Sequence, residues 1–303
     1  MPRRAALLMI VGCLIGLLGN VQPAQVRAQE TPPLPDPVLG ELDLEAVAQI
    51  DLTAYPIVPE IGEQAKLIYA EGIAKGNNPH TFIKVGDCMT YNPYFLHPLG
   101  QGDYDLGEYQ DLQPVLDYFV EGELNSFDRL SQAAAGGFNT ASVIDSLWAN
   151  PEFCQAGETP LSCEVRAMQP SIALIMFGTN DVFYLDEASF DYFLRSIVVE
   201  TIRDGILPIM STFPQRPEFP EKSVLYNQIV VQIAQDYDVP LINLWLALEP
   251  LPNKGLGDDH LHLSYPIGEP GDFSDPANLQ TGYVMRNLVT LQSLDAVWRG
   301  AMR

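Results

Sequence analysis

Basic residues are scarce in this chain of 303 residues, which has 16 lysines and arginines against 39 aspartates and glutamates. The formal net charge at pH 7 is −23. It becomes still more negative without residues 1–28, which contain arginines but no acidic residue. Such a surface repels nucleic acids and anionic membranes. The composition therefore excludes both as partners and favours solubility.

Long apolar runs are also missing after the N-terminal region. Residues 5–18 are apolar, follow two arginines and precede Val-Arg-Ala at 26–28, a pattern typical of a secretory signal peptide. We predict a signal peptide over residues 1–28, cleaved after Ala28. The mature protein is then secreted or held in the cell envelope, with no stable membrane insertion. Two alternatives stay open: an uncleaved anchor, although the run is shorter than most spanning helices, and lipoprotein processing at Cys13.

Cysteines number only four, and the first of them lies in the predicted signal peptide. Disulfides form and persist in oxidising compartments outside the cytosol. Cys154 and Cys163 enclose residues 157–160, which are rich in turn formers, so we predict a disulfide between these two cysteines. This pairing leaves Cys88 as an unpaired thiol in an exported chain.

The remaining chain divides into a leader and one domain. Residues 29–58 are rich in proline and have little periodicity, which predicts a flexible leader. Residues 59–303 have a length suited to a single domain. Within that domain, residues 98–126 are rich in acidic and aromatic side chains. We interpret them as an insertion near the functional site.

Apolar runs that alternate with helical patterns indicate the fold class. Five short runs have the composition of buried strands: 81–85, 130–135, 172–177, 206–211 and 239–244. Helical spacing covers five longer segments: 60–75, 140–149, 189–204, 221–237 and 279–302. Strands that are buried on both faces and alternate with helices predict a three-layer α/β/α fold with a central parallel sheet.

Polar motifs with glycine follow three of these predicted strands. Gly86-Asp87-Cys88 follows the first run, Gly136-Gly137 the second and Gly178-Thr179-Asn180-Asp181 the third. A fourth motif, Asp259-x-x-His262, lies nearer the C-terminus. In open parallel sheets, ligands bind at the carboxyl ends of the strands. We therefore expect these residues to meet in one crevice.

The motifs resemble those of the SGNH, or GDSL-type, hydrolases. Residues 85–90 are similar to the first block of that family, in which the serine of Gly-Asp-Ser is the nucleophile. Gly178-Thr179-Asn180-Asp181 is similar to the third block and Asp259-x-x-His262 to the fifth. The resemblance covers roughly residues 78–300 and implies a flavodoxin-like α/β/α domain that hydrolyses esters. The chain departs from the family at Cys88, which replaces the serine.

The resemblance assigns roles to three of these residues. Cys88 would be the nucleophile, and His262 the general base that takes its proton and later returns it to the leaving group. Asp259 would fix the tautomer of the imidazole and stabilise the imidazolium. The alternative for His262 is an ordinary loop histidine.

The resemblance also implies an oxyanion hole. Its donors would be the side-chain amide of Asn180 and the backbone N–H groups of Gly137 and Cys88, and such donors contribute roughly 3–4 kcal/mol each in the transition state. Gly136 is the alternative to Gly137, because the second block is the loosest match. Asn180 also suits a turn or a helix cap.

Other polar residues near the motifs have simpler interpretations. We expect Asp87 to stabilise its loop, and the acidic residues of segment 103–111 to form a solvated face. A metal site at His260 and His262, with Asp258 nearby, is a possible alternative by ligand type. The proposed chemistry requires no metal and no cofactor.

The replacement of serine by Cys88 bears directly on the activity. A thiol beside a protonated histidine or a helix N-terminus ionises readily, so we expect a lowered pKa. Three interpretations compete: a working nucleophile, the remnant of a disabled hydrolase, and a thiol oxidised outside the cell.

The favoured function is exported ester hydrolysis, acting on the acyl groups of an extracellular glycan or on a short-chain lipid ester. The alternatives are a protein that only binds a glycan or acylated ligand, and a thiol-dependent acyltransferase. The sequence defines neither the oligomeric state nor the shape of loop 91–128, which we expect to set specificity. Aromatic residues near the motifs are candidates for lining the crevice: Tyr91, Tyr94, Phe95, Phe183 and Tyr184.

Overall fold

A computed structural model describes residues 37–121 and 125–303, so the predicted signal peptide lies outside the described residues. The core of the fold is a sheet of four parallel strands in the order β1-β3-β4-β5. The strands are β1 (Asn78–Gly86), β3 (Pro170–Met176), β4 (Leu207–Ser211) and β5 (Leu241–Ile242). Every residue of β3 and β4 is buried, as expected for strands covered on both faces.

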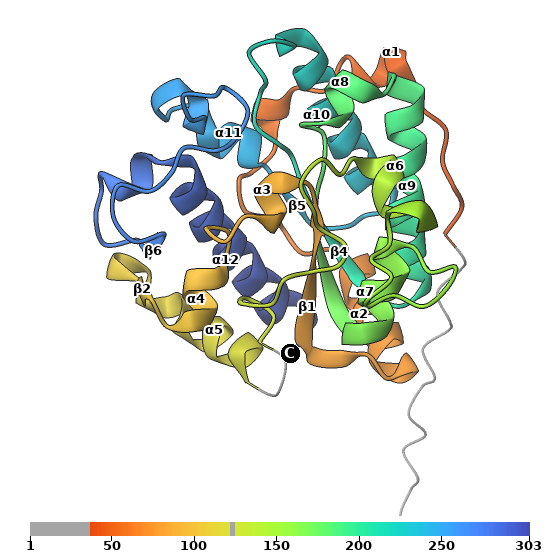
Figure 1. Cartoon of the computed structure of the whole chain (residues 1–303), viewed down its shortest axis with the longest axis horizontal. Helices are drawn as coiled ribbons and strands as arrows, with labels where there is room; N and C mark the ends of the chain where they lie inside the picture. Colours follow the sequence, from red (N-terminus) through yellow and green to blue (C-terminus); the bar gives the residue numbers. More distant parts are fainter. Residues whose placement is uncertain (1–36, 122–124) are drawn as a thin grey trace, which may run out of the picture. The chain divides into compact units, whose positions relative to one another are not determined.

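Two helical layers cover the sheet. Helices α7 (Pro160–Met168), α9 (Glu187–Arg203) and α10 (Pro220–Asp236) precede β3, β4 and β5 and form one layer. The other layer contains α2 (Glu63–Lys75), α5 (Gln113–Val120) and α12 (Gly282–Ala301). Figure 1 shows α12 and α9 on opposite sides of the sheet. The predicted three-layer α/β/α fold with a parallel sheet is therefore confirmed.

Shorter elements connect these layers. The short helices are α1 (Leu44–Val47), α3 (Cys88–Tyr91), α4 (His97–Gln101), α6 (Thr140–Val143), α8 (Asp181–Tyr184) and α11 (Leu244–Leu248). Single 3₁₀ segments cover Leu52–Ala54, Gly107–Leu112, Ser146–Trp148, Pro252–Gly255 and Asn278–Gln280. None of the helices in the described part of the chain is long and apolar enough to cross a membrane.

The predicted strand at 130–135 is wrong. Only Ala134 pairs with the sheet, through an isolated parallel bridge to Gly86. The hydroxyl of Ser131 accepts the N–H of Ala133 at 3.1 Å, and its carbonyl accepts the N–H of Ala134 at 3.4 Å. These local bonds bend the chain into a turn, because the N–H groups are no longer available for a ladder.

The predicted helix at 140–149 is also shorter than expected. It ends at Val143, and a separate 3₁₀ turn covers Ser146–Trp148. The carboxylate of Asp145 accepts the N–H of Leu147 at 2.9 Å, so it caps this new turn. A capping aspartate starts a helix rather than continuing one.

The predicted leader is folded over its described part. Val47 is buried, and the side-chain amide of Asn243 donates to the carbonyls of Leu52 and Tyr55 at 2.7 and 3.0 Å. The backbone N–H of Asn243 donates to the carbonyl of Ile57 at 3.1 Å. Residues 37–58 therefore pack as part of the folded domain, which the sequence pattern predicted to begin at residue 59.

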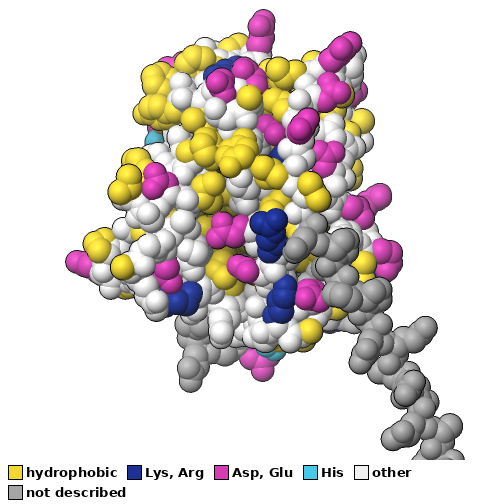
Figure 2. All heavy atoms as spheres, turned by 90° about the vertical axis from the view of Figure 1, so that its right-hand side faces the viewer, with side chains coloured by type: hydrophobic (Ala, Val, Ile, Leu, Met, Phe, Trp, Pro, Cys, Tyr) yellow, Lys and Arg dark blue, Asp and Glu magenta, His cyan; other side chains and the backbone are white. Residues whose placement is uncertain are grey.

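The described residues of the predicted insertion at 98–126 pack beside α12. Strand β2 (Tyr104–Asp105) of this insertion pairs in parallel with β6 (Gly271–Asp272), and α5 packs on β1 and α12. The acidic residues of segment 103–111 are exposed, as a solvated face requires. Figure 2 shows acidic side chains spread over the opposite side of the molecule as well, the side that carries α9.

Candidate active site

Cys88 lies at a strand-to-helix turn on the carboxyl edge of the sheet. Strand β1 ends at Gly86 and helix α3 begins at Cys88. Asp87 caps this helix, because its Oδ1 accepts the N–H of Met89 at 2.9 Å. A Cβ on Gly86 would come within 2.3 Å of Thr90 Oγ1 and 2.6 Å of the Met176 carbonyl oxygen, so the turn requires glycine.

The register of the sheet brings the other motifs to the same place. Gly86 pairs with Met176 of β3 on one side and with Ala134 on the other. The segments that follow Met176 and Ala134 contain Asn180 and Gly137. Asn180 and Gly137, the two predicted oxyanion donors, therefore lie on segments that begin beside Gly86. Cys88 follows Gly86 by two residues, so all three segments start at the same edge of the sheet.

His262 lies between the thiol and a carboxylate. Its Nε2 is 3.2 Å from Sγ of Cys88, and its Nδ1 is 2.7 Å from Oδ2 of Asp259. The other oxygen of Asp259 accepts the N–H groups of Leu261 and His262, each at 3.0 Å. The structure thus places the three residues assigned to nucleophile, base and orienting acid in one hydrogen-bonded row.

The carboxylate of Asp259 keeps its charge in this row. Partial burial acts to raise its pKa, but the hydrogen bonds from the His262 ring and from the two N–H groups hold that pKa below its usual value. An ionised Asp259 accepts a hydrogen bond from Nδ1–H, which leaves Nε2 as the ring nitrogen that faces the thiol. This arrangement is the one that a general base requires.

The loop of His262 is fastened to the start of α12. Ser264 N–H donates to the Gly255 carbonyl at 2.8 Å, and Ser264 Oγ accepts the N–H of Gly282 at 2.7 Å. A Cβ on Gly282 would lie 2.1 Å from the Gly255 carbonyl oxygen, so glycine permits this close approach. The position of the base therefore depends on α12.

Buried bonds connect the two predicted oxyanion segments. The side-chain amide of Asn180 donates to the carbonyl of Phe138 at 2.7 Å. The buried carboxylate of Asp181 accepts the N–H and hydroxyl of Thr140, at 2.8 and 2.6 Å, and the N–H of Gly178 at 3.0 Å. Gly137 has a φ of +82°, which favours glycine. The oxyanion roles, including the choice between Gly136 and Gly137, stay predictions.

A buried arginine that was not predicted from the sequence lies beneath the site. Arg286 of α12 donates through Nη2 to Thr90 Oγ1 at 2.9 Å, and its guanidinium lies 3.6 Å from the centroid of the Phe95 ring. Burial lowers the pKa of Arg286 to about 10, against the opposing effect of Asp87. A signal was present in the sequence, since Arg286 is three residues after Tyr283 and four before Thr290 and so falls on the buried face of the helix. Phe95 lies under this guanidinium and is buried, so it does not line an open crevice.

The thiol of Cys88 is harder to ionise than expected. Burial raises its pKa to about 12, and the neighbouring carboxylate of Asp87 adds to the effect. The N–H of Met89 acts in the opposite direction but is outweighed. The predicted lowered pKa is therefore wrong. The helix that begins at Cys88 has only four residues, so its dipole is small.

The alternative metal site at His260 and His262 has no third ligand among the residues that the structure describes. His260 is exposed with a φ of +56°. Within residues 37–121 and 125–303, the only group of three possible metal ligands is Cys154, Glu158 and Cys163. Its two sulfurs are bonded to each other, as the sequence predicted.

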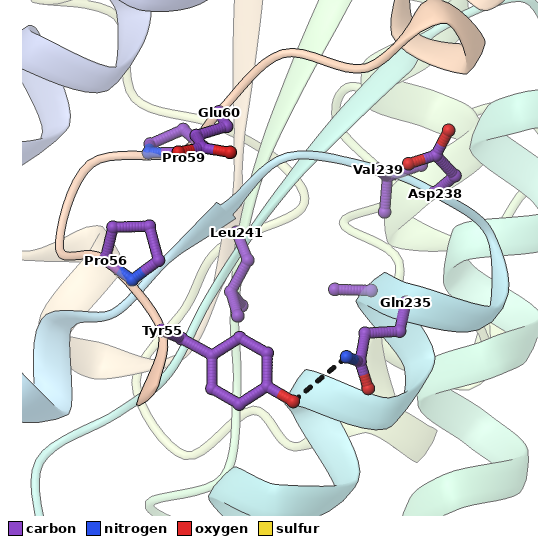
Figure 3. A pocket seen from close by; sticks show the side chains of 9 residues that line it. Tyr55, Pro56, Pro59, Glu60, Gln235, Asp238, Val239 and Leu241 are labelled. Atoms are coloured by element: carbon purple, nitrogen blue, oxygen red, sulfur yellow. Dashed lines mark hydrogen bonds between the residues drawn. The ribbon is translucent and has the colours of Figure 1, made fainter. Parts of the chain in front are cut away.

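A pocket of about 320 Å³ elsewhere on the domain is separate from this site. Figure 3 shows it between the folded leader and the end of α10, with the Gln235 amide donating to the Tyr55 hydroxyl at 2.9 Å. It includes Leu241, the first residue of β5, and so lies at the amino edge of the sheet. None of the predicted site residues lines it.

Comparison with known proteins places the chain in a family. Residues 109–266 match the GDSL-like lipase/acylhydrolase family. This segment includes Asn180, Asp259 and His262 but begins after Cys88, so the match does not test the nucleophile. No curated protein sequence matches the chain.

Several solved structures are similar to the chain at low sequence identity. A lipase/acylhydrolase from Enterococcus faecalis is 20% identical with a TM-score of 0.46, over 72% of this chain and 96% of that one. An acetylxylan esterase from Geobacillus stearothermophilus is 17% identical with a TM-score of 0.45, over 72% and 94%. An esterase from Pseudoalteromonas sp. is 14% identical with a TM-score of 0.42, over 73% and 97%.

Proposed function

Because the chain belongs to the GDSL-like lipase/acylhydrolase family, we propose that it hydrolyses esters with Cys88 as the nucleophile, His262 as the general base and Asp259 as the orienting acid. The observation that carries this proposal is the hydrogen-bonded row from Sγ of Cys88 through the imidazole to Oδ2 of Asp259, at 3.2 and 2.7 Å.

The buried position of the Cys88 thiol supports a general-base step rather than a preformed thiolate. Because its pKa is raised to about 12, the thiol keeps its proton until substrate arrives. His262 Nε2 then takes the proton as Sγ attacks the carbonyl carbon, and the carbonyl oxygen becomes an oxyanion. Asn180 and the N–H groups of Gly137 and Cys88 donate to this oxygen.

Two steps follow the attack: the tetrahedral intermediate releases the alcohol, and water then hydrolyses the thioester. The C–O bond to the alcohol breaks, the alcohol leaves with the proton from His262, and the acyl group remains on Cys88 as a thioester. Water then gives a proton to His262 and attacks the thioester. The carboxylic acid leaves, and Sγ takes the proton back from His262.

We further propose that the protein acts outside the cytosol. The bond between Cys154 and Cys163 supports this, because such bonds persist in oxidising compartments. The substrate is then an acyl group on an extracellular glycan, or a short-chain lipid ester.

The test compares the mature protein with Cys88→Ala and Cys88→Ser on p-nitrophenyl acetate. We expect turnover by the native protein and its loss in the alanine variant. If the native protein is inactive and the serine variant active, the native chain is a disabled hydrolase. If added alcohols receive the acyl group in preference to water, it is an acyltransferase. Either result contradicts the proposal.

A further inference from the structure

A surface groove of about 580 Å³ lies beside the proposed active site. It shares its inner wall with the site's own segments. Tyr91 belongs to the same short helix as Cys88, Ala134 pairs with Gly86, and the carbonyl of Phe138 holds Asn180. The groove therefore lies next to the segments that carry the thiol, although Cys88 and His262 are not among its lining residues.

Two exposed aromatic side chains form the outer part of the groove. Trp148 is 53% exposed, and its indole makes a T-shaped contact with the ring of Phe138, with ring centroids 5.9 Å apart. Phe153 is 63% exposed and precedes Cys154, whose disulfide ties the loop to α7. Arg166 of α7 also donates to the carbonyl of Phe153 at 3.2 Å. Both rings face solvent from segments that are held in place.

The charge of the groove is balanced. Its one cationic residue, Arg129, donates to both carboxylate oxygens of Glu164, each at 3.3 Å. Glu164 is buried and also accepts the N–H of Gln132 at 2.9 Å. An anionic ligand would therefore find no unpaired cation here, and the net charge of −23 opposes it further.

Polar and apolar side chains both line the groove. Ser131, Gln132 and Asn150 lie among aromatic and aliphatic residues that include Leu130, Trp148 and Phe153. A long acyl chain requires a continuous apolar channel, because each polar group it covers loses water without gaining a partner. A sugar ring offers both an apolar face for aromatic rings and hydroxyls for amides.

We propose that this groove binds the neutral carbohydrate part of an O-acylated glycan and so delivers its acyl group to Cys88. The inference rests on the proposed function and decides between its two substrate classes. Trp148 and Phe153 are the rings on which the sugars stack, and Asn150 and Gln132 are the polar partners of their hydroxyls.

A binding experiment tests the groove without catalysis. In the Cys88→Ala background, calorimetry would measure binding of cellohexaose, xylohexaose and chitohexaose. We expect at least one to bind, and Trp148→Ala and Phe153→Ala each to weaken it about tenfold or more. Tyr192→Ala is the matched control, since Tyr192 is an equally exposed aromatic on α9 that does not line the groove. Absence of binding by all three sugars overturns the inference.

An activity experiment separates this inference from the proposed function. With Cys88 intact, Phe153→Ala should lower kcat/KM for an acetylated oligosaccharide about tenfold and leave that for p-nitrophenyl acetate within twofold. A specific loss with p-nitrophenyl palmitate instead identifies an acyl-chain groove and overturns the inference. Sugar binding by a chain that hydrolyses no ester refutes the proposed function alone. If Trp148→Ala fails to fold, Phe153→Ala carries both tests.

Discussion

Asp259 and His262 have 53% and 29% of their side chains exposed, whereas Asp87 and Arg286 beneath Cys88 are buried. The exposed pair interacts with water, so its cost in stability is small and its substitution changes mainly proton transfer. The buried pair places two charges in the interior, where each depends on the other. One site therefore contains an exposed half, whose loss affects the reaction rate, and a buried half, whose loss affects folding.

Substituting the base gives the largest expected effect. His262→Asn should lower kcat/KM for p-nitrophenyl acetate on the order of 10³-fold or more, because the thiol then has no base. The melting temperature should stay nearly unchanged.

His260→Asn is the matched control, because His260 is two residues away, exposed and outside the hydrogen-bonded row. Asparagine also tolerates its left-handed backbone. Retention of more than a tenth of the activity by His262→Asn would contradict the assignment.

Substituting the buried arginine should affect folding instead. Arg286→Met removes the cation that opposes Asp87 and the bond to Thr90, so the free energy of unfolding should fall by about 3 kcal/mol or more. Urea denaturation measures this change.

Arg299→Met serves as the control on the same helix, because Arg299 is exposed and pairs with Asp295. Its stability should change little. The double variant Arg286→Met with Asp87→Asn should recover part of the loss, since it leaves no unpaired buried charge. If Arg286→Met and Arg299→Met lowered the free energy of unfolding equally, the contrast between the buried and the exposed half would be refuted.

Asp87 should make stability depend on pH. Burial raises its pKa to about 6, against 3.8 for an exposed carboxyl. Between these values the folded chain binds the proton more tightly than the unfolded chain, so this group's contribution to stability falls as pH rises from about 4 to about 6.

Asp87→Asn lacks this titration but keeps an oxygen that accepts the Met89 N–H. The stability of the variant relative to the native chain should therefore increase by up to about 3 kcal/mol from pH 4 to pH 7, at about 1.4 kcal/mol per pKa unit. Urea midpoints at both pH values measure it. A difference independent of pH would show that Asp87 titrates normally.

Alkylation of Cys88 gives the smallest expected effect. Because its pKa is raised to about 12, the thiol should react with iodoacetamide about tenfold or more slowly than free cysteine at pH 7.5. The rate should still be rising at pH 9. A rate that levels off below pH 8 would indicate a thiolate–imidazolium pair and refute the general-base step.

The sequence predicts those features that depend on local pattern. Buried apolar runs located β1, β3 and β4. The rule that parallel strands end at one edge brought Cys88 and Asn180 together, and the family resemblance added His262. Asp259 precedes His262 by three residues, so its contact with the ring needs little beyond loop closure.

Features that depend on distant contacts could not be predicted in this way. The pKa of Cys88 depends on its burial, which only tertiary packing determines. Arg286 lies 196 residues from its hydrogen-bond partner Thr90. Residues 37–58 have no periodicity of their own, yet the amide of Asn243, far along the chain, holds them against the domain.

The pairing of Gly86 with Met176 also limits how the chain tolerates insertions. The ladder between β1 and β3 is irregular between Asn78 and Phe82 and regular from Phe82 to Gly86. A residue added before Phe82 can be absorbed by that irregularity. A residue added after it would push the thiol about 3.3 Å along the strand axis, as far as the whole gap between sulfur and imidazole. Length variation among relatives should therefore be found at the entry of this strand and not at its exit.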